Sequence, residues 1–344
     1  MVASRLITSG AICLSAVWLP ARAPSSQAAT PSLVRAGSAE IAFASRRDGN
    51  WEIYVMDAAG QSQRLTRRDV EDRFPVWSPD GAQIAFGSQV GTSWELWVMD
   101  SNGARERRLY SHIVAKSARC WCRDNKRIAF AAQSDGNIDV YTVDVDSTSV
   151  TRLTSSPGED RDPSWSPDCE HLVFSSTRDG RSRIYVMGAD GSDVRRLTND
   201  SASDASPTWS PDGSAIAFVS DRRDAHDLYV IRPDGQRLER LTVGVGATRD
   251  TPRWSPDASR IAFQIARGKN YDIGLVRLAD RKRIDLARSG AYDGMYTWSP
   301  TGTQIAFISS RDGFDAVYTA DADGQHAQRL TETPSLNPAW ARGR

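Results

Sequence analysis

Aspartates precede the tryptophans of a repeated pattern at a nearly constant distance. The spacing is five residues for Asp72, Asp160, Asp204 and Asp293, and four residues for Asp250. Equal spacing predicts that the first four carboxylates point in similar directions. Carboxylate oxygens are hard ligands that suit calcium and manganese ions. One hypothesis is therefore a divalent cation site, calcium or manganese, at Asp72, Asp160, Asp204 and Asp293.

The alternative is that these carboxylates are solvated loop acids or ion-pair partners. Arg73, Arg161 and Arg249 are direct sequence neighbours of three of the five aspartates. Lys116 and Ser335 occupy the corresponding positions of two further repeats, so the acidic series is interrupted. Structural ion pairs are commoner than functional sites among such acids. Both interpretations stay open from the sequence.

A second group of residues is typical of binding surfaces. Trp51, Trp94, His226 and Tyr271 occupy equivalent places in their repeats, and Arg46 and Arg47 lie close to the first tryptophan. Exposed tryptophans beside arginines are typical of interface anchors and of platforms that stack on sugars. We expect this group to bind a protein or a polysaccharide. The alternative is that each indole packs over its own loop.

Catalytic residues are not identified by any motif. The histidines are scattered at His112, His171, His226 and His326, and the chain has neither a G-x-S-x-G nor a C-x-x-C motif. The recurring pairs Arg47-Asp48, Arg178-Asp179 and Arg311-Asp312 are interpreted as loop-fixing hydrogen-bond partners. The same role is expected for Glu52, Glu95, Asp139, Asp227 and Asp272.

A tandem repeat positions all of these side chains. Its tryptophans are Trp77, Trp121, Trp165, Trp209, Trp254, Trp298 and Trp340, at intervals of 44, 44, 44, 45, 44 and 42 residues. Each complete unit reads W-S-P-D-G, I-A-F, a polar loop, I-Y-V-M-D, a D-G turn and R-L-T. Four short apolar runs separated by turn residues predict four antiparallel strands. The fold class is thus all-β, a seven-bladed β-propeller.

The two ends of the chain are expected to share one blade. The first I-A-F run, at Ile41, has no tryptophan strand before it, and Trp340 has no second strand after it. Pairing of the N-terminal and C-terminal strands would close the ring and remove its open edges. Residues 41–340 are then a single propeller, and 341–344 form a short tail.

The N-terminus has the pattern of a secretory signal peptide. Arg5 is followed by an apolar stretch from Leu6 to Leu19, too short to span a bilayer, and small residues follow Pro20. We expect a signal peptide over 1–28 with cleavage near 23–29, then a short segment over 29–40. Export implies a periplasmic or secreted protein in an oxidising compartment. There Cys122 and Cys169 either form a disulfide or remain free thiols.

Charge and composition exclude several classes of partner. The chain has 43 basic and 43 acidic residues among 344. This balance gives no electrostatic footprint for a phosphate backbone, so we expect no nucleic-acid partner. We also expect no membrane span after removal of the signal, and a monomer, because ring closure leaves no edge strand for association.

The repeat resembles a known family. W-S-P-D-G, I-A-F, S-x-R-D-G, I-Y-V-M-D-x-D-G and R-L-T together are similar to the TolB-type propeller repeat. The resemblance implies a bacterial periplasmic propeller. In TolB the propeller follows an α/β domain, has six blades and contacts a peptidoglycan-associated lipoprotein. Oligogalacturonate lyases and the propellers of prolyl-oligopeptidase-like enzymes also look related, and in the lyases the propeller carries a metal-assisted site.

Two functions follow as hypotheses. The first is a non-catalytic propeller that holds a protein or cell-envelope polymer on its variable rim, which is formed by the loops between the second and third strands and between blades. The second is a metal-assisted lyase or hydrolase that acts on a carbohydrate or similar secreted substrate at the channel mouth. Fold alone does not choose between them.

Overall fold

The computed structural model describes residues 40–114, 120–223, 225–248 and 250–341. Contacts divide the chain into Met1–Val34 and Arg35–Arg344, and every described residue belongs to the second unit. The expected signal peptide, nearly all of the segment 29–40 and Lys116 therefore lie outside the described residues.

The described residues form β-strands and no helix. One sheet combines both ends of the chain: Ser335–Trp340 (β28), Ile41–Ser45 (β1), Glu52–Met56 (β2) and Ser62–Arg64 (β3). The next contains Glu71–Trp77 (β4), Gln83–Val90 (β5), Ser93–Asp100 (β6), Arg107–Ile113 (β7), Cys120–Trp121 (β8), Arg127–Ser134 (β9), Asn137–Asp144 (β10) and Val150–Arg152 (β11).

Four further sheets have four antiparallel strands each. They comprise Asp160–Trp165 (β12), His171–Ser176 (β13), Arg183–Gly188 (β14) and Arg195–Arg196 (β15); Asp204–Trp209 (β16), Ile216–Ser220 (β17), Asp227–Ile231 (β18) and Glu239–Arg240 (β19); Arg253–Trp254 (β20), Arg260–Arg267 (β21), Asn270–Arg277 (β22) and Arg283–Ala287 (β23); and Asp293–Trp298 (β24), Gln304–Ser309 (β25), Ala316–Asp321 (β26) and Gln328–Arg329 (β27).

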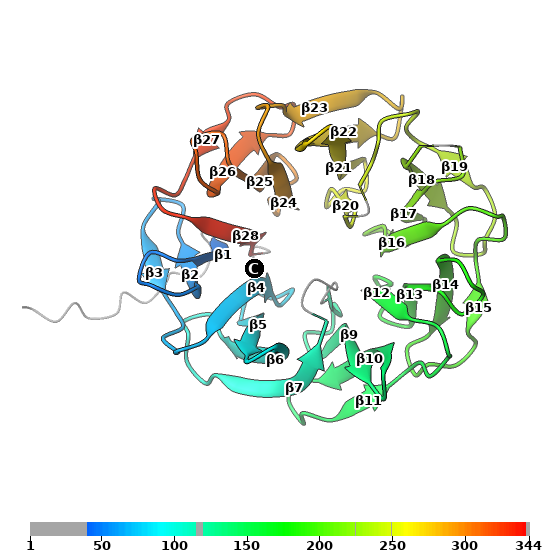
Figure 1. Ribbon diagram of the computed structural model, residues 1–344, viewed down its shortest axis with the longest axis horizontal. Helices are drawn as coiled ribbons and strands as arrows, with labels where there is room; N and C mark the ends of the chain where they lie inside the picture. Colours follow the sequence, from blue (N-terminus) through cyan, green and yellow to red (C-terminus); the bar gives the residue numbers. More distant parts are fainter. Residues whose placement is uncertain (1–39, 115–119, 224, 249, 342–344) are drawn as a thin grey trace, which may run out of the picture. The chain divides into compact units, whose positions relative to one another are not determined.

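The tryptophan strands are innermost in the described unit. Figure 1 shows β4, β12, β16, β20, β24 and β28 toward the centre, with β3, β7, β11, β15, β19, β23 and β27 outermost. The expected pairing of the chain ends is present, because Ile41 pairs with Trp340 and Ser45 with Ser335. The eight-stranded sheet arises because β7 of one repeat pairs with β9 of the next at Ile113 and Ala132.

The central phenylalanine of each second strand is buried in the core. These residues are Phe43, Phe86, Phe130, Phe174, Phe218, Phe263 and Phe307, and each is at most 1% exposed. The strands around them are apolar on consecutive positions because both faces of each sheet are covered by its neighbours. Hydrophobic burial against adjacent sheets therefore holds the unit together.

Indole N–H groups link the innermost strands. Trp77 Nε1 donates to the carbonyl oxygen of Ala339 at 3.1 Å, and Trp298 Nε1 donates to that of Arg253 at 2.9 Å. In both cases the acceptor directly precedes the tryptophan of the preceding repeat. Trp121 and Trp254 make the equivalent bonds to Val76 and Thr208. These four tryptophans thus supply packing area and also a link to the neighbouring sheet, whereas the buried Nε1 atoms of Trp165, Trp209 and Trp340 have no partner among the described residues.

A bulge recurs three residues before the tryptophan of the inner strand. At this position Phe74, Asp162, Ser206, Met295 and Asn337 have φ values between 51° and 59°. Left-handed backbone is uncommon for residues other than glycine and often occurs where a structure redirects a side chain. The ladder to the second strand shifts register here, for example between Arg161 and Ser164.

Cys122 and Cys169 form a disulfide between successive repeats, with a Cα–Cα distance of 5.7 Å. The disulfide interpretation is therefore confirmed over that of free thiols. Cys120 remains a free thiol, and burial raises its pKa to about 12. In the described part of the chain, no helix long and apolar enough to cross a bilayer is found.

Candidate functional site

The four equally spaced aspartates are fully buried and bound by arginines. Asp160 accepts hydrogen bonds from Arg178, Asp204 from Arg222 and Asp293 from Arg311. Each of these arginines lies 18 residues after its aspartate, in the loop that follows the second strand of the same sheet. The partners are therefore not Arg73 and Arg161, the sequence neighbours considered first.

Each of these guanidinium groups also lies on aromatic rings. The Cζ atoms of Arg178, Arg222 and Arg311 are each 4.7 Å from the ring centroid of a tyrosine in the third strand, and 5.4 to 5.6 Å from that of the buried phenylalanine. A cation over an aromatic face is stabilised by the ring quadrupole. The aspartate, arginine and aromatic pair thus form one repeated packing unit.

Asp72 uses a different arginine for the same arrangement. Arg68, four residues before it, donates to both carboxylate oxygens, with one bond of 2.8 Å. The Cζ of Arg68 lies 4.0 Å from the ring centroid of Trp97. Burial nevertheless outweighs the Arg68 charge and raises the pKa of Asp72 to about 6.

The arrangement of these carboxylates does not match an open cation site. Cysteine, histidine and acidic ligand atoms converge in two places among the described residues, and neither contains Asp72, Asp160, Asp204 or Asp293. One is the disulfide pair with Asp124, and the other is the exposed turn Asp168, Glu170 and His171. In this structure each of the four aspartates is ion-paired with an arginine, so the residues present do not fit a manganese or calcium ion there.

The loop-fixing role of the other acids is visible in their hydrogen bonds. Tyr185 donates its hydroxyl to Asp179, which also pairs with Arg196 at 2.8 Å. Burial, followed by this hydrogen bond, raises the pKa of Tyr185 to about 12. At the start of the third strand, Asp227 is buried and pairs with Arg240. These acids hold the loops and the outer strand in place.

Trp51 and Trp94 lie on either side of strand β4. The Cζ of Arg73 is 4.7 Å from the Trp51 ring centroid, and the ring of Phe74 meets that of Trp94 edge to face at 5.3 Å. Arg73 and Phe74 are consecutive, and the bulge at Phe74 lets them diverge toward different indoles. We call Trp51, Arg73, Phe74 and Trp94 the β4 row. Both indoles are half-buried.

Arg73 gives the β4 row its charge. Burial lowers the pKa of Arg73, and Glu71 pairs with its guanidinium at 2.8 Å. Its Nε is buried and has no hydrogen-bond partner among the described residues. The β4 row therefore combines two indoles, a phenyl ring and a guanidinium group that has one unpaired N–H. This combination is typical of interface hot spots.

The other expected binding residues are dispersed. Arg47 stacks on Tyr54 at 4.4 Å and donates to Ser62 at 2.7 Å, so it serves the fold of its own sheet. Arg46 lies near enough to Arg73 for its charge to lower the pKa of Arg73. His226 is on the β17–β18 loop, and Tyr271, 38% exposed, packs edge to face on Tyr292.

Asp162 and Asp250 form an acidic pair whose partnership the sequence did not indicate. Asp162 lies at a bulge of the inner strand with φ 53°. Burial raises its pKa, and the charge of Asp250 adds to the effect. Asp250 is itself solvent-exposed, but surrounding protein displaces part of its hydration and raises its pKa. An x-P-x-W pattern accompanies the bulges at Phe74, Asp162, Ser206 and Asn337, but the bulge at Met295 lacks the proline.

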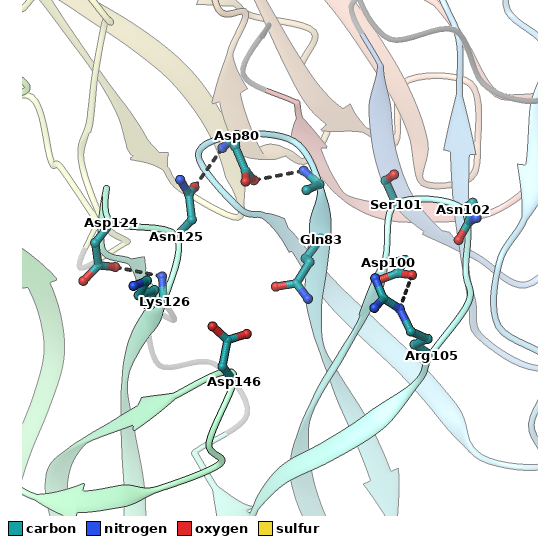
Figure 2. Close-up of a pocket in the computed structure, with 11 residues that line it drawn as sticks. Asp80, Gln83, Asp100, Ser101, Asn102, Arg105, Asp124, Asn125, Lys126 and Asp146 are labelled. Atoms are coloured by element: carbon teal, nitrogen blue, oxygen red, sulfur yellow. Dashed lines mark hydrogen bonds and ion pairs between the residues drawn. The ribbon is translucent and has the colours of Figure 1, made fainter.

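A polar pocket of about 440 Å³ lies between the turns of two successive repeats, including the P-D-G turn at Asp80 (Figure 2). Its aspartates are engaged in their own turns: Asp80 Oδ1 accepts from Ser78 Oγ at 2.6 Å, and Asp100 pairs with Arg105 at 2.6 Å. Figure 2 shows Asn125 reaching across to the backbone N–H of Asp80. These contacts show that Asp80 and Asp100 stabilise their own turns.

Comparison with known proteins agrees with the repeat and the sheet architecture. The TolB beta propeller domain family matches residues 112–203, 178–251 and 244–342. The chain belongs to this family. No curated protein matches it.

Solved structures share the fold at low sequence identity. TolB from Acinetobacter baumannii is 19% identical over 88% of this chain, with a TM-score of 0.60, and the chain spans 66% of that protein. An oligogalacturonate lyase in complex with manganese is 18% identical over 82% of this chain and 85% of its own, with a TM-score of 0.66. A puromycin hydrolase mutant is 16% identical, with 87% and 52% coverage and a TM-score of 0.67.

Proposed function

We propose that this protein is a non-catalytic periplasmic or secreted propeller that binds a protein or cell-envelope polymer through the β4 row. The observation that carries the proposal is the contact series from Trp51 through Arg73 and Phe74 to Trp94. Large aromatic side chains around a partly buried arginine supply binding energy at low entropic cost, because they are already held in place.

The proposed scaffold is a monomeric, closed ring of seven blades. The strands group by sequence into seven sets of four, and the eight-stranded sheet then contains two blades joined at Ile113 and Ala132. The pairing of β28 with β1 supports closure. A rigid ring suits a binding role, because it fixes loops from different blades relative to one another.

Binding to purified peptidoglycan sacculi and to a periplasmic extract tests the proposal. The mature chain, the W51A/W94A variant and the control L238A/V243A are compared by co-sedimentation and by chemical crosslinking. The control removes two exposed apolar side chains elsewhere on the surface. We expect one polymer or one crosslinked protein to be lost with W51A/W94A alone. Equal retention by all three proteins would contradict the proposal.

A second candidate function is a lyase or hydrolase acting on a carbohydrate at the channel mouth. It is favoured by Asp162 and Asp250, because desolvation raises the pKa of both carboxyl groups, and a raised pKa suits a general acid. Turnover of acidic oligosaccharides by the wild type, abolished in D162N and D250N, would support this candidate. Absence of turnover in the wild-type protein would contradict it.

A further inference from the structure

A second cavity lies where the inner strands end, on the rim of the W-S-P turns. Its volume is about 410 Å³, and residues from six of the seven sets of strands line it. The wall consists largely of flat apolar rings: the indoles of Trp77, Trp121, Trp254, Trp298 and Trp340, with prolines of the adjoining turns. This volume is within the range of small-molecule sites.

Four of these indoles are fixed before any ligand arrives. Trp77, Trp121, Trp254 and Trp298 each donate to a backbone carbonyl of the preceding repeat, at 2.9 to 3.2 Å. Trp340 differs, because its Nε1 is buried and has no partner among the described residues. The cavity therefore has preorganised aromatic faces.

The charges in the wall have one sign. Among the described residues, Arg123 and Arg253 line the cavity, and no carboxylate does. Both side chains are exposed, and neither has a carboxylate within ion-pairing distance in the described part of the chain. Arg123 reaches across to the carbonyl oxygen of Pro211 at 3.1 Å. Desolvation raises the pKa of Asp250, and the nearby charge of Arg253 partly opposes this rise, but Asp250 is not part of the lining.

We propose that this cavity binds a small organic anion with a flat apolar body, of the aromatic carboxylate class. Guanidinium groups match the two oxygens of a carboxylate, and indole and proline faces match a planar ring. The chain as a whole has balanced charge, so the excess of positive charge at this cavity is local. The site is separate from the β4 row and does not depend on the proposed function.

Calorimetric titration with 2-naphthoate and its neutral counterpart 2-naphthamide tests the assignment. The proteins are the wild type, R123Q/R253Q and the control R181Q/R237Q, which removes two exposed arginines outside the cavity. We expect one naphthoate per chain, bound at least tenfold more tightly than the amide by the wild type and the control. The preference should disappear in R123Q/R253Q.

Three results would overturn the proposal: no naphthoate binding up to about 5 mM, equal affinity of the wild type for acid and amide, or an unchanged preference in R123Q/R253Q. Melting temperatures verify that each variant is folded. The single variant R123Q, whose side chain is exposed, gives an independent result and should lose part of the preference for the acid.

Discussion

Arg178 donates two hydrogen bonds, 3.1 and 3.0 Å long, to the carboxylate of Asp160. Asp160 is fully buried, and its other close partner is the hydroxyl of Ser156 at 3.1 Å. The carboxylate of Asp160 is therefore shielded from solvent and paired within its own sheet. The same relationship recurs with Asp204 and Asp293.

Replacing only the arginine should be costly. R178M leaves the Asp160 carboxylate buried without its cation, and we expect a loss of about 3–5 kcal/mol in the free energy of unfolding. The double variant D160N/R178M should recover a large part of this loss, because no buried charge remains. Urea unfolding of both variants, with the exposed R181M as control, measures the coupling. Strictly additive effects would contradict the interpretation.

Asp72 predicts a pH dependence of stability. Its pKa is raised to about 6 in the folded protein, against an ordinary value of 3.8 for an aspartate in water. Between these values the folded state binds the extra proton, so this group makes stability fall as the pH rises from 4 to 6. D72N removes the effect. The stability of D72N relative to wild type should increase by up to about 3 kcal/mol from pH 4 to 7. A difference that is flat with pH would show that Arg68 keeps Asp72 ionised throughout.

The Cys122–Cys169 disulfide should stabilise the protein through its unfolded state. The two cysteines are 47 residues apart, and closing a loop of that length corresponds to about 4 kcal/mol in the chain-entropy account. The C122A/C169A variant should melt several degrees lower than wild type under oxidising conditions. C120A, which removes the free thiol, serves as control. If reductant leaves the wild-type melting temperature unchanged, the disulfide contributes nothing.

The C-terminal strand should be required by the whole ring. Deleting residues 332–344 removes β28, in which Trp340 pairs with Ile41. The deletion therefore exposes the edge of β1. We expect the melting temperature of the entire protein to fall in one cooperative transition. An unchanged melting temperature would be inconsistent with ring closure.

The sequence predicted the sheets well because the repeat is encoded locally. Each tryptophan ends an inner strand, and the end pairing followed from the incomplete first and last repeats. Ion-pair partners were harder to predict, because Arg178 is 18 residues from Asp160 and meets it only across a folded hairpin. The bulge that aims Phe74 and Asp162 depends on backbone conformation, which residue types did not reveal.

The candidate site was predicted in part. Trp51 and Trp94 were identified from their equivalent positions, but Arg73 and Phe74 were not recognised as the residues between them. The cavity lined by Arg123 and Arg253 was also missed. The cavity forms only when the turns of several repeats come together, and no single repeat contains it.

The most direct test of the binding proposal is to measure partner affinity and melting temperature together for W51A/W94A. Both indoles are half-buried, so we expect the melting temperature to fall by less than about 5 °C, in line with partial loss of packing. The affinity for the captured protein or polymer should fall at least tenfold. A large melting shift with unchanged affinity would instead show that the two tryptophans serve only the packing of strand β4.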